Sequence, residues 1–141
     1  MDNYEKAIEA MKENALCTLK FAEGYYNVLK RSLLHRSRFR NDVLYGIITI
    51  CFEKLMVALM SSYNQIPISH TPIMLFKDAQ KIESRLSEHM LDTTRLINRF
   101  ESICSLDGFG YKTPSDDDIK TMIIGLKSIY NLVVKRITIE I

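Results

Sequence analysis

Apolar residues recur every three or four positions along most of the chain, and this spacing predicts α-helices. Between Tyr4 and Leu33 they form one continuous stripe on one side of a long helix. A second clean stripe runs from Ile119 to Ile137, with acidic residues before it and basic residues near its end, as the helix dipole favours. Strand-like alternation is confined to the last five residues, ITIEI, which are too few to outweigh the helix before them. We therefore expect an all-α fold.

The stretch from Val43 to Tyr63 differs because it is apolar on nearly every side. A helix of this kind must be covered on most sides, either by lipid or by other helices. Its only charged residues, Glu53 and Lys54, lie near the middle, where lipid would penalise a charge by about 2–3 kcal/mol. We therefore expect a central helix of a soluble bundle, in which each of the two charges meets another helix or the surface.

Polar residues and prolines mark where these helices begin and end. Residues 30–41 are rich in arginine and lack acidic residues, so we expect the turn between the first and second helices here. Asn41 or Asp42 is the predicted N-cap of the second helix. Thr71 followed by Pro72 predicts the start of a third helix, because the missing N–H of proline costs nothing at that position.

The second half of the chain leaves one boundary open. The Asp-Thr-Thr run at 92–94 offers a fresh N-cap, so we expect a break or kink within residues 87–93, giving either one bent helix or two. Thr113 or Ser115 is the predicted cap of the last helix. These boundaries predict a single domain over residues 1–141, built as an up-and-down bundle of four to five helices.

Composition sets the broad class of the protein. With 141 residues, 47% hydrophobic and 26% charged, the chain is expected to form one globular domain. The net charge of +2 is too small to identify a partner. Cys17, Cys51 and Cys104 lack paired spacing, so we expect buried free thiols in a reducing compartment. No export signal is apparent, which favours the cytoplasm. We expect no cofactor, no metal and no membrane association.

Three segments in a fixed order resemble the HEPN domain family of small all-helical proteins. They are FEKLMVALM at 52–60, SHTPIMLF at 69–76 after a short polar link, and the closing YNLVVKRI at 130–137. The resemblance implies a helical domain that often dimerises. It also implies that the domain binds nucleotides or RNA, cuts RNA, or pairs with a minimal nucleotidyltransferase as a toxin–antitoxin system.

The ribonucleases of this family place an arginine before a histidine with four to six residues between them. No histidine of this chain has an arginine at that spacing. Two pairs come near it, Arg31 with His35 and Arg85 with His89, each with three residues between. We therefore expect a non-catalytic binding module. The alternatives are a diverged metal-independent ribonuclease that uses His35 or His89, and an interaction scaffold that binds no nucleic acid.

The candidate ligand-binding residues gather in residues 30–40, which we call the basic turn. Arginine offers a fork of donors that matches phosphate oxygens, and Arg31 and His35 are expected to share one helical face. The alternative is a solvated helix end. His70, at the start of a predicted helix, would receive an anion or serve as a cap. The candidates are Arg31, His35, Arg36, Arg38, Arg40 and His70.

Two further expectations concern partners and aromatic residues. We expect a homodimer, with residues left over from the bundle stripes, such as Tyr25 and Met90, supplying its contacts. The loop at 107–112 carries Phe109 and Tyr111, which would either stack on a base or pin the loop to the bundle.

Overall fold

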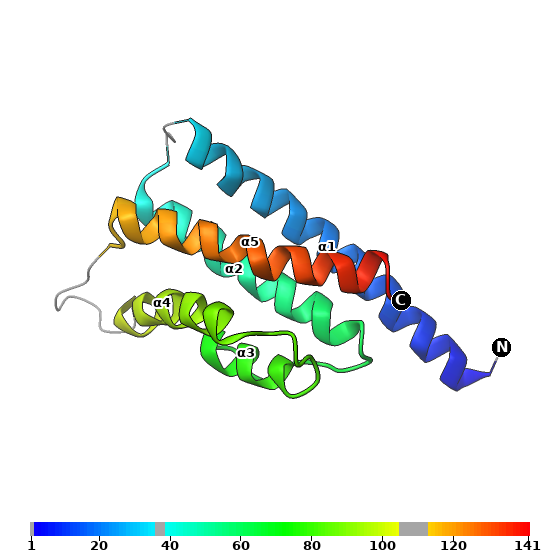
Figure 1. Cartoon of the computed structure of the whole chain (residues 1–141). Helices are drawn as coiled ribbons and strands as arrows, with labels where there is room; N and C mark the ends of the chain where they lie inside the picture. The colour runs from blue at the N-terminus through cyan, green and yellow to red at the C-terminus, as the bar shows by residue number, and fades with distance from the viewer. Residues whose placement is uncertain (1, 36–38, 105–112) are drawn as a thin grey trace.

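The computed structural model describes residues 2–35, 39–104 and 113–141, without the side chains of residues 102–104. Over these ranges the chain forms five α-helices and no strand (Figure 1), which confirms the predicted all-α bundle. The helices are α1 (Asn3–Leu34), α2 (Asn41–Ser61), α3 (Pro72–Gln80), α4 (Glu88–Cys104) and α5 (Asp116–Thr138).

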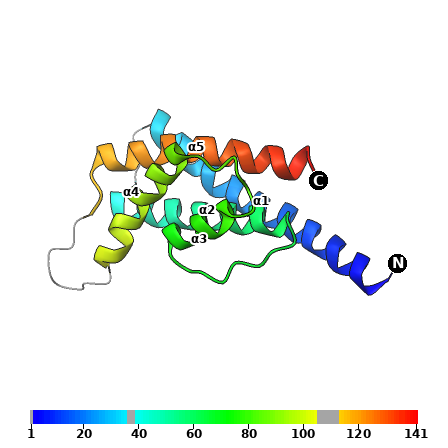
Figure 2. The same ribbon diagram turned by 60° about the horizontal axis from the view of Figure 1, so that its bottom comes forward.

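The long helices pack around α2. The Cys51 thiol lies 3.6 Å from the Ala22 carbonyl oxygen, and the Asn14 amide donates to Ser61 Oγ at 2.9 Å, so α1 and α2 are antiparallel. In contrast, α2 and α5 run in the same direction, because their first residues meet at one end and their last residues at the other. The short α3 and the oblique α4 cover the remaining side (Figure 2).

The predicted enclosure of α2 by its own neighbours is only partly confirmed. Phe52, Leu55 and Leu59 are completely buried, but Val43 and Ile50 are each 40% exposed on the outer side. Among the described residues, α2 is also the one helix long and apolar enough to cross a membrane, judged by length and composition alone. Because 56% of its most apolar window is buried, it equally fits the core helix of a soluble bundle.

The helix α1 is longer than the bundle that it joins. It contains 32 residues, against 21 in α2, and its first turns extend past the last turn of α5 (Figures 1 and 2). Tyr4 is 73% exposed, and the buried residues of α1 begin only at Ala15. The predicted stripe from Tyr4 to Leu33 is therefore a core face over its middle part alone.

Two of the predicted helix starts are confirmed. Thr71 precedes α3, with Pro72 in its first turn. Ser115 caps α5 in a reciprocal capping box, since its hydroxyl accepts the Asp118 N–H while the Asp118 carboxylate accepts the Ser115 N–H. The open choice after α3 resolves into two helices, but the residues that join them are 81–87, so the break comes earlier than the predicted range of 87–93.

Two predicted caps are wrong. Arg40, not Asn41 or Asp42, is the N-cap residue of α2, and its side chain makes no capping bond. The helix α4 begins before the predicted cap at 92–94, so Thr94 lies inside it and donates its hydroxyl to the Met90 carbonyl at 2.9 Å. A threonine hydroxyl can bond the carbonyl four residues earlier, which explains why this residue tolerates a helix interior.

The prediction of buried cysteines is correct at one position and wrong at another. Cys51 is buried as expected, and burial raises its pKa to about 12. Cys17 is exposed, so the prediction of a buried thiol is wrong there, because this residue lies outside the buried face of α1. The Cys104 side chain is outside the described residues.

Candidate functional site

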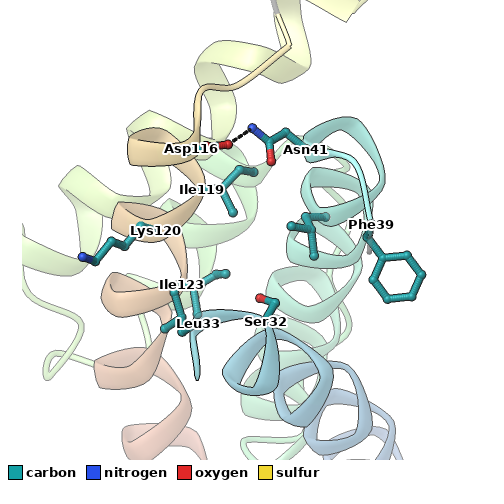
Figure 3. Close-up of a pocket in the computed structure, with 9 residues that line it drawn as sticks. Ser32, Leu33, Phe39, Asn41, Asp116, Ile119, Lys120 and Ile123 are labelled. Atoms are coloured by element: carbon teal, nitrogen blue, oxygen red, sulfur yellow. Dashed lines mark hydrogen bonds between the residues drawn. The ribbon is translucent and has the colours of Figure 1, made fainter. Parts of the chain in front are cut away.

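A cavity of about 400 Å³ opens at the end of the bundle where α1 finishes and where α2 and α5 begin (Figure 3). Its volume lies within the range of roughly 300–1,000 Å³ that is usual for small-molecule sites. The inner wall is apolar, one side is polar, and two long side chains stand at the rim. The lining residues are Ser32, Leu33, Phe39, Asn41, Leu44, Asp116, Ile119, Lys120 and Ile123.

The polar side of the cavity is a hydrogen-bonded bridge between α2 and α5 (Figure 3). The Asn41 amide nitrogen donates to Asp116 Oδ1 at 2.7 Å and to the Pro114 carbonyl at 3.0 Å. Both amide protons are thereby used, so the side-chain oxygen of Asn41 and the second oxygen of Asp116 stay as acceptors. This side of the cavity suits a ligand that donates hydrogen bonds, such as a hydroxyl or an amino group.

The rim carries one aromatic ring and one cation. Phe39 is 50% exposed, and Lys120 is exposed on α5. In Figure 3 the two side chains lie on opposite sides of the opening and point away from its middle, whereas Ile123 and Leu33 lie between the helices. Because Lys120 is exposed on α5, its long side chain can turn toward a ligand that occupies the opening.

Two described arginines of the basic turn lie in water near this opening. The Arg31 guanidinium makes one long bond, 3.4 Å, to the Asn27 carbonyl of its own helix. The Arg40 side chain is 81% exposed and pairs with Asp42 at 3.2 Å. An ion pair this exposed contributes little to stability, so Arg40 can exchange it for another anion. Arg36 and Arg38 lie outside the described residues.

The predicted pairing of Arg31 and His35 on one helical face is wrong. The helix ends at Leu34, and His35 is its C-cap with an extended backbone, φ −128° and ψ 135°. Its side chain therefore leaves the helical position that would place it over Arg31. Arg31 and His35 therefore do not form a preformed acid–base pair.

Acidic residues share this end with the basic turn. Asp116, Asp117 and Asp118 form the first turn of α5, where they complement the positive end of the helix dipole. The Asn41 bridge brings Asp116 beside the start of α2. The surface here is consequently mixed in charge, which favours a small ligand with both phosphate and hydroxyl groups over a long polyanion.

His70 lies at a second cavity, away from the basic turn. It is exposed and lines this cavity of about 270 Å³ with Glu53, Val57 and Ser69, and the Ser69 hydroxyl donates to Asp78 at 2.6 Å. Glu53 lies roughly 18 Å further along α2 than Asn41, at 1.5 Å per residue. The structure therefore separates His70 from the basic turn.

Arg85 and His89, the second pair that comes near the ribonuclease spacing, have different surroundings. His89 is exposed in the first turn of α4. The Arg85 guanidinium donates to Glu83 at 2.8 Å and to Glu140 at 2.7 Å, so its donors are already engaged by two carboxylates. The predicted aromatic loop at 107–112 is outside the described residues.

Sequence reasoning missed the residues that build the cavity. Asn41 was expected only as a cap, and Phe39, Asp116 and Lys120 were not expected at a site. Asn41 and Asp116 are 75 positions apart, so no local spacing links them. A signal that links them appears only once α2 and α5 are known to start side by side.

Within the described part of the chain, no group of three or more histidine, cysteine or acidic residues is arranged to hold a metal ion. Comparison of the chain with models of known protein families, with curated proteins and with solved structures finds no match in any of the three.

Proposed function

We propose that this chain is a non-catalytic, HEPN-like binding module of the cytoplasm that binds a nucleotide in the 400 Å³ cavity. The observation that supports this proposal is the combination at one opening of an apolar inner wall, free acceptors on Asn41 and Asp116, and exposed cations nearby. A nucleotide presents the same three chemistries in one molecule: a flat apolar base, hydroxyl donors and phosphate.

Each part of the nucleotide would contact a different part of the cavity. The base would rest against Leu33, Ile119 and Ile123, where burial of its faces stabilises the complex. Ribose hydroxyls would donate to Asp116. The phosphates would lie outward, where Lys120 and Arg40 are free to approach them. Phe39 lines the cavity at its rim, where it would contact the base.

The family resemblance supplies the wider setting of the proposal. A module of this kind would act beside a minimal nucleotidyltransferase in a toxin–antitoxin pair. The nucleotide would then be a ligand that both proteins bind. A diverged ribonuclease is not favoured, because Arg85 is already paired with Glu83 and Glu140 and His35 lies outside its helix. A protein scaffold without nucleotide would leave the cavity without a role.

Calorimetric titration with nucleoside monophosphates and triphosphates tests the proposal. Lys120→Ala should weaken binding by about five- to tenfold, because one phosphate contact is lost, and rising salt should weaken it further. Lys127→Ala is the matched control, since Lys127 is also exposed on α5 but does not line the cavity. Absence of binding to the wild-type chain, or equal losses in both variants, would refute the proposal.

A separate assay tests the alternative that the chain is a ribonuclease. The wild-type chain and the His35→Ala and His89→Ala variants should all leave single-stranded RNA intact in the presence of a chelator. Metal-independent cleavage that either substitution abolishes would instead establish the enzyme.

A further inference from the structure

The second cavity lies beside the second half of α2, away from the opening where α2 and α5 begin. Its volume is about 270 Å³, a little below the roughly 300 Å³ at which drug-sized ligand sites usually begin. The extended connection after α2 turns back along that helix before α3 begins, and so forms one side of the cavity (Figure 2). This size suits a ligand smaller than a nucleotide. The lining residues are Glu53, Val57, Pro67, Ser69, His70 and Leu75.

The polar groups that line this cavity are almost all hydrogen-bond acceptors. The Ser69 hydroxyl donates its one proton to Asp78 Oδ2 at 2.6 Å, so its oxygen can only accept from a ligand. Pro67 has no N–H, so its backbone adds an acceptor and no donor. The Glu53 carboxylate accepts only, and a neutral His70 imidazole adds one more acceptor beside its single N–H. The cavity therefore suits a ligand that donates hydrogen bonds.

The Glu53 carboxylate gives the cavity a negative charge that the described part of the chain does not neutralise. No hydrogen bond or ion pair joins this carboxylate to another described residue. The neighbouring Lys54 lies about 100° further around the helix, so the two side chains cannot easily pair. Asp78, behind Ser69, already pairs with Lys81 at 3.7 Å. Because the described lining residues include no lysine or arginine, a cation from outside is the partner that the carboxylate lacks.

The start of α3 offers little to an anion, which was one of the two roles expected at His70. A helix N-terminus binds anions through its free N–H groups. Pro72 has no N–H, and the Ile73 N–H donates to Asn98 Oδ1 at 3.2 Å. Of the first three residues of the helix, Met74 alone keeps an N–H that no described residue accepts. An anion here would meet one backbone donor and the repulsion of a carboxylate.

We infer that the second cavity binds an alkylammonium ion, whose NH₃⁺ group donates to Glu53 and Ser69. An ammonium group carries three donors and no acceptor, which matches an acceptor-rich wall with one negative charge. The alkyl chain lies against Val57 and Leu75, where burial of its methylene groups adds to the affinity. The inference is independent of the proposed nucleotide site, because Glu53 lies roughly 18 Å further along α2 than Asn41.

Titration of the full chain with pentylamine, followed by NMR of its methyl groups, tests this site. Pentylamine should shift the signals of Val57 and Leu75 with a dissociation constant on the order of 1 mM. Pentanol and pentanoate have the same alkyl chain without the positive charge, so they should bind about tenfold more weakly or less. Equal shifts with all three compounds, or no shift with pentylamine, would overturn the inference.

Glu53→Gln separates the charge of the site from its shape. Glutamine keeps the size of the side chain but removes the charge, so pentylamine should bind about tenfold more weakly. Glu13→Gln is the matched control, because Glu13 is also exposed but lies on α1 and does not line the cavity. This variant changes the net charge by the same amount and should bind like the wild type. Equal losses in the two variants would show that only the overall charge of the chain matters, which would overturn the site.

A comparison of two ligands distinguishes the source of the alkylammonium group. Nα-acetyl-lysine methylamide presents a lysine side chain with an amide on each side, as a peptide does. Tighter binding of this compound than of pentylamine would assign the cavity to a lysine of a protein partner, and weaker binding would assign it to a free aliphatic amine. Nucleotide binding by Glu53→Gln should match the wild type, so failure of one proposal is distinguishable from failure of the other.

Discussion

The two ends of the bundle use charged side chains in opposite ways. At the closed end, where α2 and α5 finish, the Glu83 carboxylate is buried and accepts hydrogen bonds from Tyr63 and Arg85. At the open end, where α2 and α5 begin, Arg40 and Lys120 lie in water beside a cavity. Charges of the first kind hold the chain together, whereas charges of the second kind are free to meet a ligand.

One connected network of hydrogen bonds and ion pairs joins the elements at the closed end. Arg136 donates to the Ser62 hydroxyl at 3.0 Å and to the Ser62 carbonyl at 2.8 Å, and its guanidinium lies 3.7 Å from the centre of the Tyr63 ring. Arg85 joins Glu83 to Glu140 near the C-terminus. The α3–α4 connection is thereby tied to the ends of both α2 and α5. Such a network explains how a connection without regular structure keeps one conformation.

The largest effect is expected from Glu83→Gln. Glutamine keeps the shape of the side chain but removes the buried carboxylate charge to which Tyr63 and Arg85 donate hydrogen bonds, so the free energy of unfolding should fall by roughly 2–4 kcal/mol. Urea denaturation measures the change. Glu140→Gln is the control, because it removes an outer carboxylate of the same network and should cost less. If the two variants lose equal stability, Glu83 does not hold the closed end.

The same carboxylate makes stability depend on pH. Its hydrogen bond with Arg85 is the main reason that the pKa of Glu83 falls from 4.5 to about 2 in the folded protein. The unfolded chain therefore binds the proton first, so this contribution is present above pH 4.5 and is lost as the pH falls toward 2. Urea titrations across this range should show a loss of stability in the wild type that Glu83→Gln lacks.

Asn41→Ala tests whether the open end is held by one bridge. The substitution removes the amide that joins α2 to Asp116 and Pro114, and it should lower the free energy of unfolding by about 1 kcal/mol. Calorimetric melting would record the loss. Nucleotide affinity should fall with it, because Asn41 and Asp116 form the polar side of the cavity. Unchanged affinity would move the ligand away from this bridge.

The smallest effect on folding is expected from Arg40→Ala. The ion pair with Asp42 is exposed, so the melting temperature should shift little, corresponding to less than about 0.5 kcal/mol. Nucleotide affinity should nevertheless decrease. A large loss of stability would show that the open end uses its charges as the closed end does.

The sequence predicts two of the helix starts that neighbouring residues decide, but it places the caps of α2 and α4 wrongly. Thr71 before Pro72 and Ser115 before its acidic turn mark helix starts correctly, because a cap depends on residues within one turn. The apolar run after Val43 likewise marks the central helix. Contacts between residues that are far apart in the sequence are missed. An example is the network that joins Arg85 to Glu140, 55 positions away. For the same reason the cavity beside the basic turn was not foreseen, although the turn itself was.

The length of α1 has a consequence for its motions. The first turns of the helix lie beyond α5, where the Asp2 side chain accepts the Glu5 N–H and no described residue before Ala15 is buried. Isolated helical segments of this length are marginal in water. Amide protons near Tyr4 should therefore exchange with deuterium much sooner than those near Ala22, so this one helix contains both fast and slow exchanging sites.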